Sequence, residues 1–471
     1  MAESMSTLDS IFLHTEDGIT HMHIGSCAIF EGPPPAAGEL TSLIEGKLPL
    51  LSRYRQKVRF VPGGVGNPVW VDDADFSVDY HVRHTALPQP GDQGELENLM
   101  GRVMSQELDR DRPLWEEWVV DGLSGDRWAL ISKVHHCMVD GVSGTDLMTV
   151  LLDDDPAAAI QPPQAWAAGR EPSDLELTVT AITDLAMTPV RQVRGLVSDV
   201  LHPLQTLSHL GDITTGLRSL GHVASPSRSL STNGTIGSHR RWAAGRCLLK
   251  DVKTIRSRLG GSVNDVLLAA IAGAFRSILL ERGDDIGADD VMRSLVPVSV
   301  RVPGDHTLDN QVSLIIAELP IGIVEPVARL ESVCAQMNRL KASHQATAGV
   351  AVLAAAASAP PALLAFTLHA AAALLRTTGQ QSVNTVTTNV AGPGYPLYAL
   401  GREMLEYLPF VPLSQGVRIG VAIMSYNGHI AFGITGDYDS APDVHAMAEQ
   451  VETEIAVLLE LAAEQSNRGT S

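Results

Sequence analysis

The hydrophobic and polar positions of the first third of the chain follow two periods, which predict strands and helices in mixed order. Residues 21–32 alternate apolar and polar side chains, as a half-buried strand does, and residues 127–136 form an apolar run with the length of a buried strand. Residues 38–58 and 95–109 instead repeat apolar side chains at helical spacing. This part of the chain is therefore predicted to be an α/β (α+β) domain.

The remainder of the sequence predicts further helices and strands, which suggests a second domain. Two helices are expected over residues 247–283, where Gly260–Gly261 ends the first and either Ser262 or Asn264 caps the second. The pattern also predicts strands at 294–301 and 311–321, a hairpin at 417–439 that turns at Asn427–Gly428, and a closing amphipathic helix at 443–463.

Changes in composition place the domain boundaries. A Pro- and Ala-rich stretch follows Asp155, so we predict an N-terminal domain at 1–155, a partly mobile linker and helical crossover at 156–240, and a C-terminal domain at 241–471. Residues 342–375 hold no Asp, Glu, Lys or Arg, but they are mostly alanine and are interrupted by Pro360–Pro361. They are more typical of buried or lipid-facing helices than of a membrane-spanning one.

Charge and cysteine content narrow the function. The chain has 471 residues and a net charge of −20, which disfavours sequence-independent nucleic-acid binding and broad electrostatic docking on anionic lipid, although residues 238–242 form a local basic patch. Its four cysteines are scattered without metal-ligand spacing, and the N-terminus has no secretory pattern. We therefore expect a cytoplasmic protein with reduced thiols that is not secreted.

The segment KVHHCMVDGVSG at 133–144 is the strongest candidate for chemistry. If the preceding strand continues through the doublet, His135 and His136 face opposite sides, so one is expected to be a base and the other a structural support. Gly141 allows a sharp turn and Asp140 can brace it. Three alternatives compete: two core histidines, a metal site that lacks a third ligand, and Cys137 acting as a nucleophile.

Several motifs together make the chain resemble a known family. HHCMVDG matches the HHxxxDG motif of the CoA-dependent acyltransferases. The PLW element at Pro113, Leu114 and Trp115 and the ND element at Asn264 and Asp265 resemble those of the bacterial wax ester synthase / diacylglycerol acyltransferases, of the actinobacterial triacylglycerol synthase type. Later blocks follow in the same order, with NVAGPG where the family commonly has NVPGP. Each element alone also has a structural explanation, such as a helix cap for ND.

The resemblance implies a fold and a mechanism. It implies two chloramphenicol-acetyltransferase-like domains with an active-site tunnel at their interface, and it assigns His136 as the general base, with Asp140 in the catalytic motif and His135 and Gly141 in support. No bound cofactor or metal is implied, because acyl-CoA is a co-substrate. Asn264 is a candidate oxyanion donor.

The expected partners follow from the same resemblance. They are long-chain acyl-CoA, diacylglycerol or a long-chain alcohol, and peripheral contact with a membrane or lipid droplet, where residues 346–375 would offer an apolar surface. Two alternatives remain: an acyltransferase that depends on a carrier protein, and a non-catalytic lipid-binding paralogue.

Overall fold

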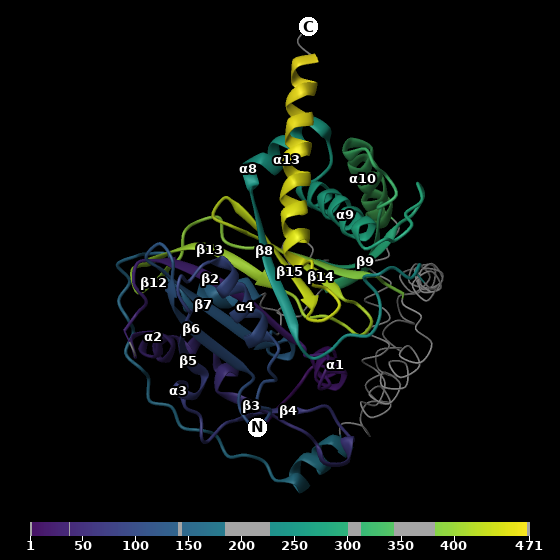
Figure 1. Ribbon diagram of the computed structural model, residues 1–471. Helices are drawn as coiled ribbons and strands as arrows, with labels where there is room; N and C mark the ends of the chain where they lie inside the picture. The colour runs from purple at the N-terminus through teal and green to yellow at the C-terminus, as the bar shows by residue number, and fades with distance from the viewer. Residues whose placement is uncertain are drawn as a thin grey trace, which may run out of the picture.

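The computed structural model describes residues 2–36, 38–139, 144–183, 227–299, 312–342 and 382–468. In this part of the chain, strands and helices form two lobes, each built on a six-stranded sheet (Figure 1). The predicted α/β class is confirmed. Residues 346–375 lie outside the described part of the chain.

The first sheet has the strand order β12-β13-β2-β7-β6-β5. Its strands are β2 (His23–Glu31), β5 (Val82–Ala86), β6 (Trp115–Leu123), β7 (Arg127–His135), β12 (Tyr398–Ala399) and β13 (Arg402–Phe410). The antiparallel pair β2 and β7 lies at its centre, and its register places His23 opposite His135. The two strands predicted near 21–32 and 127–136 are therefore neighbours.

The helices of this lobe are α1 (Thr7–Thr15), α2 (Glu39–Lys47), α3 (Val78–His81), α4 (Gln93–Met104) and α5 (Gly144–Leu151), and a small sheet joins β1 (Glu3–Ser4), β4 (Val69–Asp72) and β3 (Gln56–Arg59). The helix predicted over 38–58 was too long, because α2 ends at Lys47. Pro49 follows, and short 3-10 turns lead into β3.

The second sheet has the order β10-β9-β11-β14-β15-β8. Its strands are β8 (Arg240–Leu248), β9 (Met292–Ser299), β10 (Val312–Leu319), β11 (Thr385–Ala391), β14 (Ile419–Tyr426) and β15 (His429–Asp437). The hairpin turn occurs where predicted: Asn427 and Gly428 both have positive φ, at 42° and 82°, as a type I′ turn requires.

Four helices lie over one side of this sheet (Figure 1): α8 (Leu249–Leu259), α9 (Val263–Glu281), α10 (Pro326–Ala342) and α13 (Val444–Arg468). Ser262 caps α9, and its hydroxyl and the Asp265 side chain form a reciprocal capping box. The alternative cap, Asn264, is thereby excluded. Among the described helices, α9 is the only one long and apolar enough to cross a membrane, yet it is largely buried and packs in the core of this lobe.

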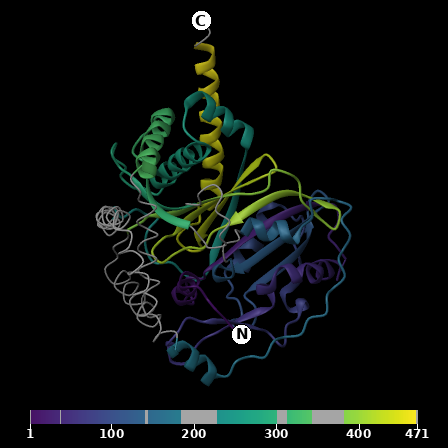
Figure 2. The ribbon, with the colours of Figure 1, turned by 180° about the vertical axis from the view of Figure 1, so that it is seen from behind.

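The two lobes are interlocked. β12 and β13 come from the predicted C-terminal domain but complete the N-terminal sheet, where β13 pairs with β2. β13 also packs against β14 and β15, and α4 packs against β8, so the first lobe covers the side of the second sheet that faces away from its helices (Figure 2). Residues 398–410 therefore tie the two lobes together.

Candidate active site

The strand β7 ends at His135, and His136 begins a 3-10 turn, His136–Met138. The N-cap of this turn is His135, whose Nδ1 accepts the backbone N–H of Cys137 at 3.1 Å. The predicted strand therefore ends one residue early, between the two histidines, so strand alternation does not decide which way His136 faces. Their surroundings nevertheless differ as the predicted division of roles requires.

His136 lies against the N-terminal helix. Its ring stacks on Phe12 of α1 with the centroids 3.9 Å apart, and its backbone N–H donates to the Met22 carbonyl at 2.9 Å. The buried Nδ1 atom has no hydrogen-bond partner among the described residues. Burial lowers the pKa of His136 to about 4, so its imidazole is neutral near pH 7 and is able to accept a proton.

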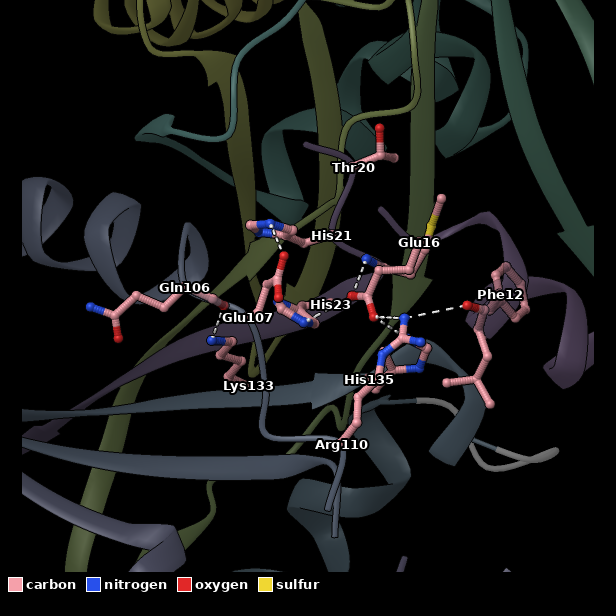
Figure 3. Close-up of polar contacts among 12 residues, drawn as sticks. Phe12, Glu16, Thr20, His21, His23, Gln106, Glu107, Arg110, Lys133 and His135 are labelled. Atoms are coloured by element: carbon pink, nitrogen blue, oxygen red, sulfur yellow. Dashed lines mark hydrogen bonds and ion pairs between the residues drawn. The ribbon is translucent and has the colours of Figure 1, made fainter. Parts of the chain in front are cut away.

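His135 belongs instead to a buried charge cluster (Figure 3). Its Nε2 lies 3.5 Å from Oε2 of Glu16, and Nε2 of the cross-strand neighbour His23 lies 3.2 Å from Oε1 of the same carboxylate. Arg110 completes the cluster with a 2.6 Å contact to Oε2. Burial alone would raise the pKa of Glu16, but contacts with His135 and His23 hold it well below its usual range, so the carboxylate is ionised.

The predicted catalytic residue Asp140 and the predicted support Gly141 lie outside the described residues. The next described element is α5, which begins at Gly144. Their roles in the turn therefore stay predictions.

The PLW element lies at the start of the strand next to the histidine doublet and contacts it through the backbone. The Leu114 carbonyl accepts the backbone N–H of His135 at 2.9 Å, and the buried indole of Trp115 donates to the Tyr54 carbonyl at 2.9 Å. Trp115 also stacks on His81 with the ring centroids 4.4 Å apart. Pro113 precedes this pair and carries no backbone N–H. The element therefore acts through packing and backbone contacts.

The ND element lies in the second lobe, beside a cavity of about 370 Å³. Asp265 is buried in the helix cap, whereas Asn264 accepts a hydrogen bond from Nδ2 of Asn389 at 2.9 Å. Both asparagines line the cavity, together with apolar side chains from α9, β11 and β14. His136 is not part of this lining, so the structure does not bring the two motifs together at this cavity.

The predicted basic patch at 238–242 is not an exposed cationic surface. Arg240 is buried, and its guanidinium donates to the backbone carbonyls of Ile19, Gly237 and His239. Arg241 stacks over Tyr438, with its guanidinium carbon 4.0 Å from the ring centroid. These arginines join segments of the fold to one another.

The structure does not support the two alternative chemistries for this segment, a Cys137 nucleophile and a metal site. Burial raises the pKa of the Cys137 thiol well above its usual range, which disfavours a thiolate nucleophile. Within the described ranges, no group of three or more His, Cys, Asp or Glu side chains is placed to hold a metal ion.

Sequence reasoning missed the residues that surround the doublet: Phe12, Glu16, His23 and Arg110. The only available signal was the alternation of His21 and His23 on the first predicted strand, which places both on one face. Nothing local marked Glu16, because its role depends on α1 packing against the end of β7.

Comparisons with known proteins agree with this architecture. The first condensation domain of the calcium-dependent antibiotic synthetase is similar in fold, with a TM-score of 0.58 at 15% identity over 99% of this chain and 97% of that one. A solved wax ester synthase/diacylglycerol acyltransferase from Marinobacter aquaeolei has a TM-score of 0.69 at 25% identity, over 98% and 100% of the two chains. The fold thus defines a protein of the two-domain condensation and acyltransferase class.

Sequence comparison identifies the family within that class. The wax ester synthase/diacylglycerol acyltransferase catalytic domain matches residues 5–267, and the C-terminal domain of the same family matches residues 308–458. A Mycobacterium tuberculosis protein named as a probable diacylglycerol O-acyltransferase, tgs1, is 35% identical over 97% of this chain and 96% of its own length. The chain belongs to the wax ester synthase/diacylglycerol acyltransferase family, and the resemblance drawn from its motifs is confirmed.

Proposed function

We propose that this protein transfers a long-chain acyl group from acyl-CoA to the free hydroxyl of diacylglycerol, forming triacylglycerol. The observation that carries this proposal is the half-buried imidazole of His136, which directly follows β7 within the motif that the family shares and is neutral near pH 7 because its surroundings lower its pKa to about 4. The activity in the name of the full-length relative supports the choice of acceptor.

The reaction needs one proton acceptor and no covalent enzyme intermediate. His136 takes the proton of the acceptor hydroxyl while that oxygen attacks the thioester carbon. The tetrahedral oxyanion then collapses, the carbon–sulfur bond breaks, and the departing thiolate recovers the proton from the imidazolium. Because both substrates meet directly, their orientation supplies much of the acceleration.

The test is a competition assay with purified protein, long-chain acyl-CoA and diacylglycerol. An apolar pocket discriminates weakly between hydroxyls on different apolar bodies, so added hexadecanol should suppress triacylglycerol formation as wax ester appears. Two independent, non-competing activities would contradict a shared site. Transfer from a carrier-bound acyl group, with none from acyl-CoA, would overturn the proposed donor.

We further propose that the protein works at a lipid surface as a peripheral cytoplasmic enzyme on membranes or lipid droplets. Residues 174–183 form a helix whose outer face exposes Leu175, Val179 and Ile182, while Leu177 of the same helix is buried against Val61, Val69 and Val71. These three side chains repeat at helical spacing, so they form an apolar stripe that an interfacial helix would bury in lipid.

Liposome flotation tests this contact. Binding to phosphatidylcholine vesicles that contain diacylglycerol should fall in a Leu175→Glu/Val179→Glu variant, and a Thr178→Glu variant serves as a matched control on the same helix. Because the net charge is −20, anionic lipid should not strengthen binding. Equal flotation of all three proteins would remove this helix from the proposal.

A further inference from the structure

The carboxylate of Glu16 makes four contacts that converge on the histidine doublet. Oε1 accepts the backbone N–H of Met22 at 3.1 Å and lies 3.2 Å from Nε2 of His23. Oε2 accepts from Arg110 at 2.6 Å and lies 3.5 Å from Nε2 of His135. The side chain is 7% exposed, so these contacts replace its hydration almost entirely.

The first route from Glu16 to the doublet is through the ring of His135. Its Nδ1 accepts the Cys137 N–H, so in the neutral ring the proton must be on Nε2. This proton is on the nitrogen beside the Glu16 carboxylate, which accepts but cannot donate. The carboxylate thus favours the one tautomer that also allows the turn at Cys137 to form.

The second route reaches the backbone of His136. The Glu16 carboxylate accepts a hydrogen bond from the backbone N–H of Met22. The carbonyl of Met22 in turn accepts the backbone N–H of His136 at 2.9 Å. Phe12, which stacks on the His136 ring, lies on α1 one turn before Glu16, the C-cap residue of this helix. The end of this helix therefore contacts both histidines.

One cation compensates the charge of the carboxylate: Arg110 faces it from the loop after α4. The rings of His23 on β2 and His135 on β7 also face it. Further out, His21 on the segment before β2 lies 3.6 Å from Glu107. On β7, the Lys133 ammonium donates to the Val103 and Gln106 carbonyls, and burial lowers its pKa to about 8.

We propose that Glu16 is a positioning residue of the transfer reaction: it holds His135 in the tautomer protonated at Nε2 and, through Met22, fixes the backbone that carries His136. This role rests on the proposed function, because it assumes that His136 is the base. Glu16 need not touch either substrate.

The first experiment compares Glu16→Gln with wild type by steady-state kinetics and by nitrogen NMR of protein labelled in its histidines. Glutamine keeps the shape but presents an amide that donates as well as accepts, so both tautomers of His135 become compatible with the site. We expect kcat to fall by about 10- to 100-fold, as small misplacements of reacting groups do, with little change in KM for acyl-CoA. The His135 signals, assigned by their loss in His135→Gln, should show a mixture of tautomers.

The matched control is Glu454→Gln. Glu454 is also a poorly exposed carboxylate bound to an arginine, 3.2 Å from Arg329, but it lies on α13 in the other lobe. It should lose thermal stability without a loss of kcat. A Glu16→Gln variant whose activity loss only follows its melting temperature, as in this control, would overturn the positioning role.

A double-mutant cycle separates the proposal from the assignment of the base. If Glu16 acts through His135, then Glu16→Gln should cost little in a His135→Gln background, whereas additive losses contradict the coupling. An unchanged tautomer in Glu16→Gln overturns the role of Glu16, whether or not His136 is the base. Full turnover by His136→Ala overturns the proposed base instead.

Discussion

The two six-stranded sheets are built alike but differ in what they bury. The central strands of the first sheet bury Glu117, Lys133, His23 and His135 at the end nearest α1. The central hairpin of the second sheet, β14 and β15, buries mainly apolar side chains under α9 and α13. The first sheet thus buries a cluster of ionisable groups along its central strands, whereas the buried ionisable residues of the second sheet, Arg240 and Asp437, face each other at the outer ends of β8 and β15.

This difference places the cost of desolvating ionisable groups mainly in the first sheet. Removing an ionisable group from water is unfavourable unless partners compensate, and the pKa values record this. Burial raises the pKa of Glu117 to about 8 and lowers that of His23 to about 3. Groups kept at such a cost are candidates for function, whereas the second sheet provides the packing that holds the first in place.

The largest expected effect is on turnover. His136→Ala should fold normally and lose activity by about 10²–10⁴-fold, as removal of a general base does. An exposed histidine on the same sheet, His84, gives the control His84→Ala, which should keep full activity. Steady-state assays with long-chain acyl-CoA and diacylglycerol measure this. Near-normal turnover by His136→Ala would contradict the assignment of the base, and with it the functional role of the first sheet.

The second effect concerns stability and lies in the other lobe. Phe275 is completely buried in α9, so Phe275→Ala should destabilise the protein by about 3–5 kcal/mol through lost burial and a residual cavity. Activity per folded molecule should stay unchanged, because the side chain packs only in the second core. Denaturant melts combined with active-site-normalised kinetics measure both quantities. A loss of kcat in the folded fraction would show that this core also shapes the site.

The third effect is a pH dependence of stability. His136 and His23 have folded pKa values of about 4 and about 3, below the ordinary 6.5, so between pH 6.5 and 4 the unfolded chain binds protons that the folded chain does not. The contribution of these two histidines to stability is therefore full above pH 6.5 and falls by an amount on the order of a few kcal/mol as the pH is lowered. Glu117, whose pKa is raised to about 8, contributes in the opposite sense, because its protonated form is favoured in the folded chain. Hydrogen exchange at pH 7 and pH 5 should show β2 and β7 losing protection before β14 and β15. Equal loss in both sheets would contradict a local origin.

The smallest effect is expected at Cys137. Its buried thiol is protonated and takes no part in the proposed transfer, so Cys137→Ala should keep substantial activity and lose about 1 kcal/mol of stability. Mass spectrometry after incubation with acyl-CoA should find no acyl group on this residue. A trapped thioester would replace direct transfer with a covalent route.

The local patterns predicted the elements well where the hydrophobic period was long and clear. The hairpin at Asn427–Gly428 and the helix that follows Ser262 occur as expected, because turn and capping chemistry act within a few residues. The long helix over 38–58 was wrong because apolar spacing continued past Pro49, where the backbone could not. The strand predicted over 127–136 ends at His135 instead, because the period of a strand does not indicate where the strand ends.

The sequence by itself determined the fold class, the family and the segment that carries the candidate base, because motifs and periods are local and are read along the chain. Only the tertiary structure showed that β13 completes the first sheet and that Glu16 lies beside His135, which is 119 positions further along the chain. Such contacts depend on how α1 packs against the end of β7, and the pairing of two distant surfaces leaves no period in either segment. The position of a side chain follows from the whole packed core, whereas its chemistry is already present in its type.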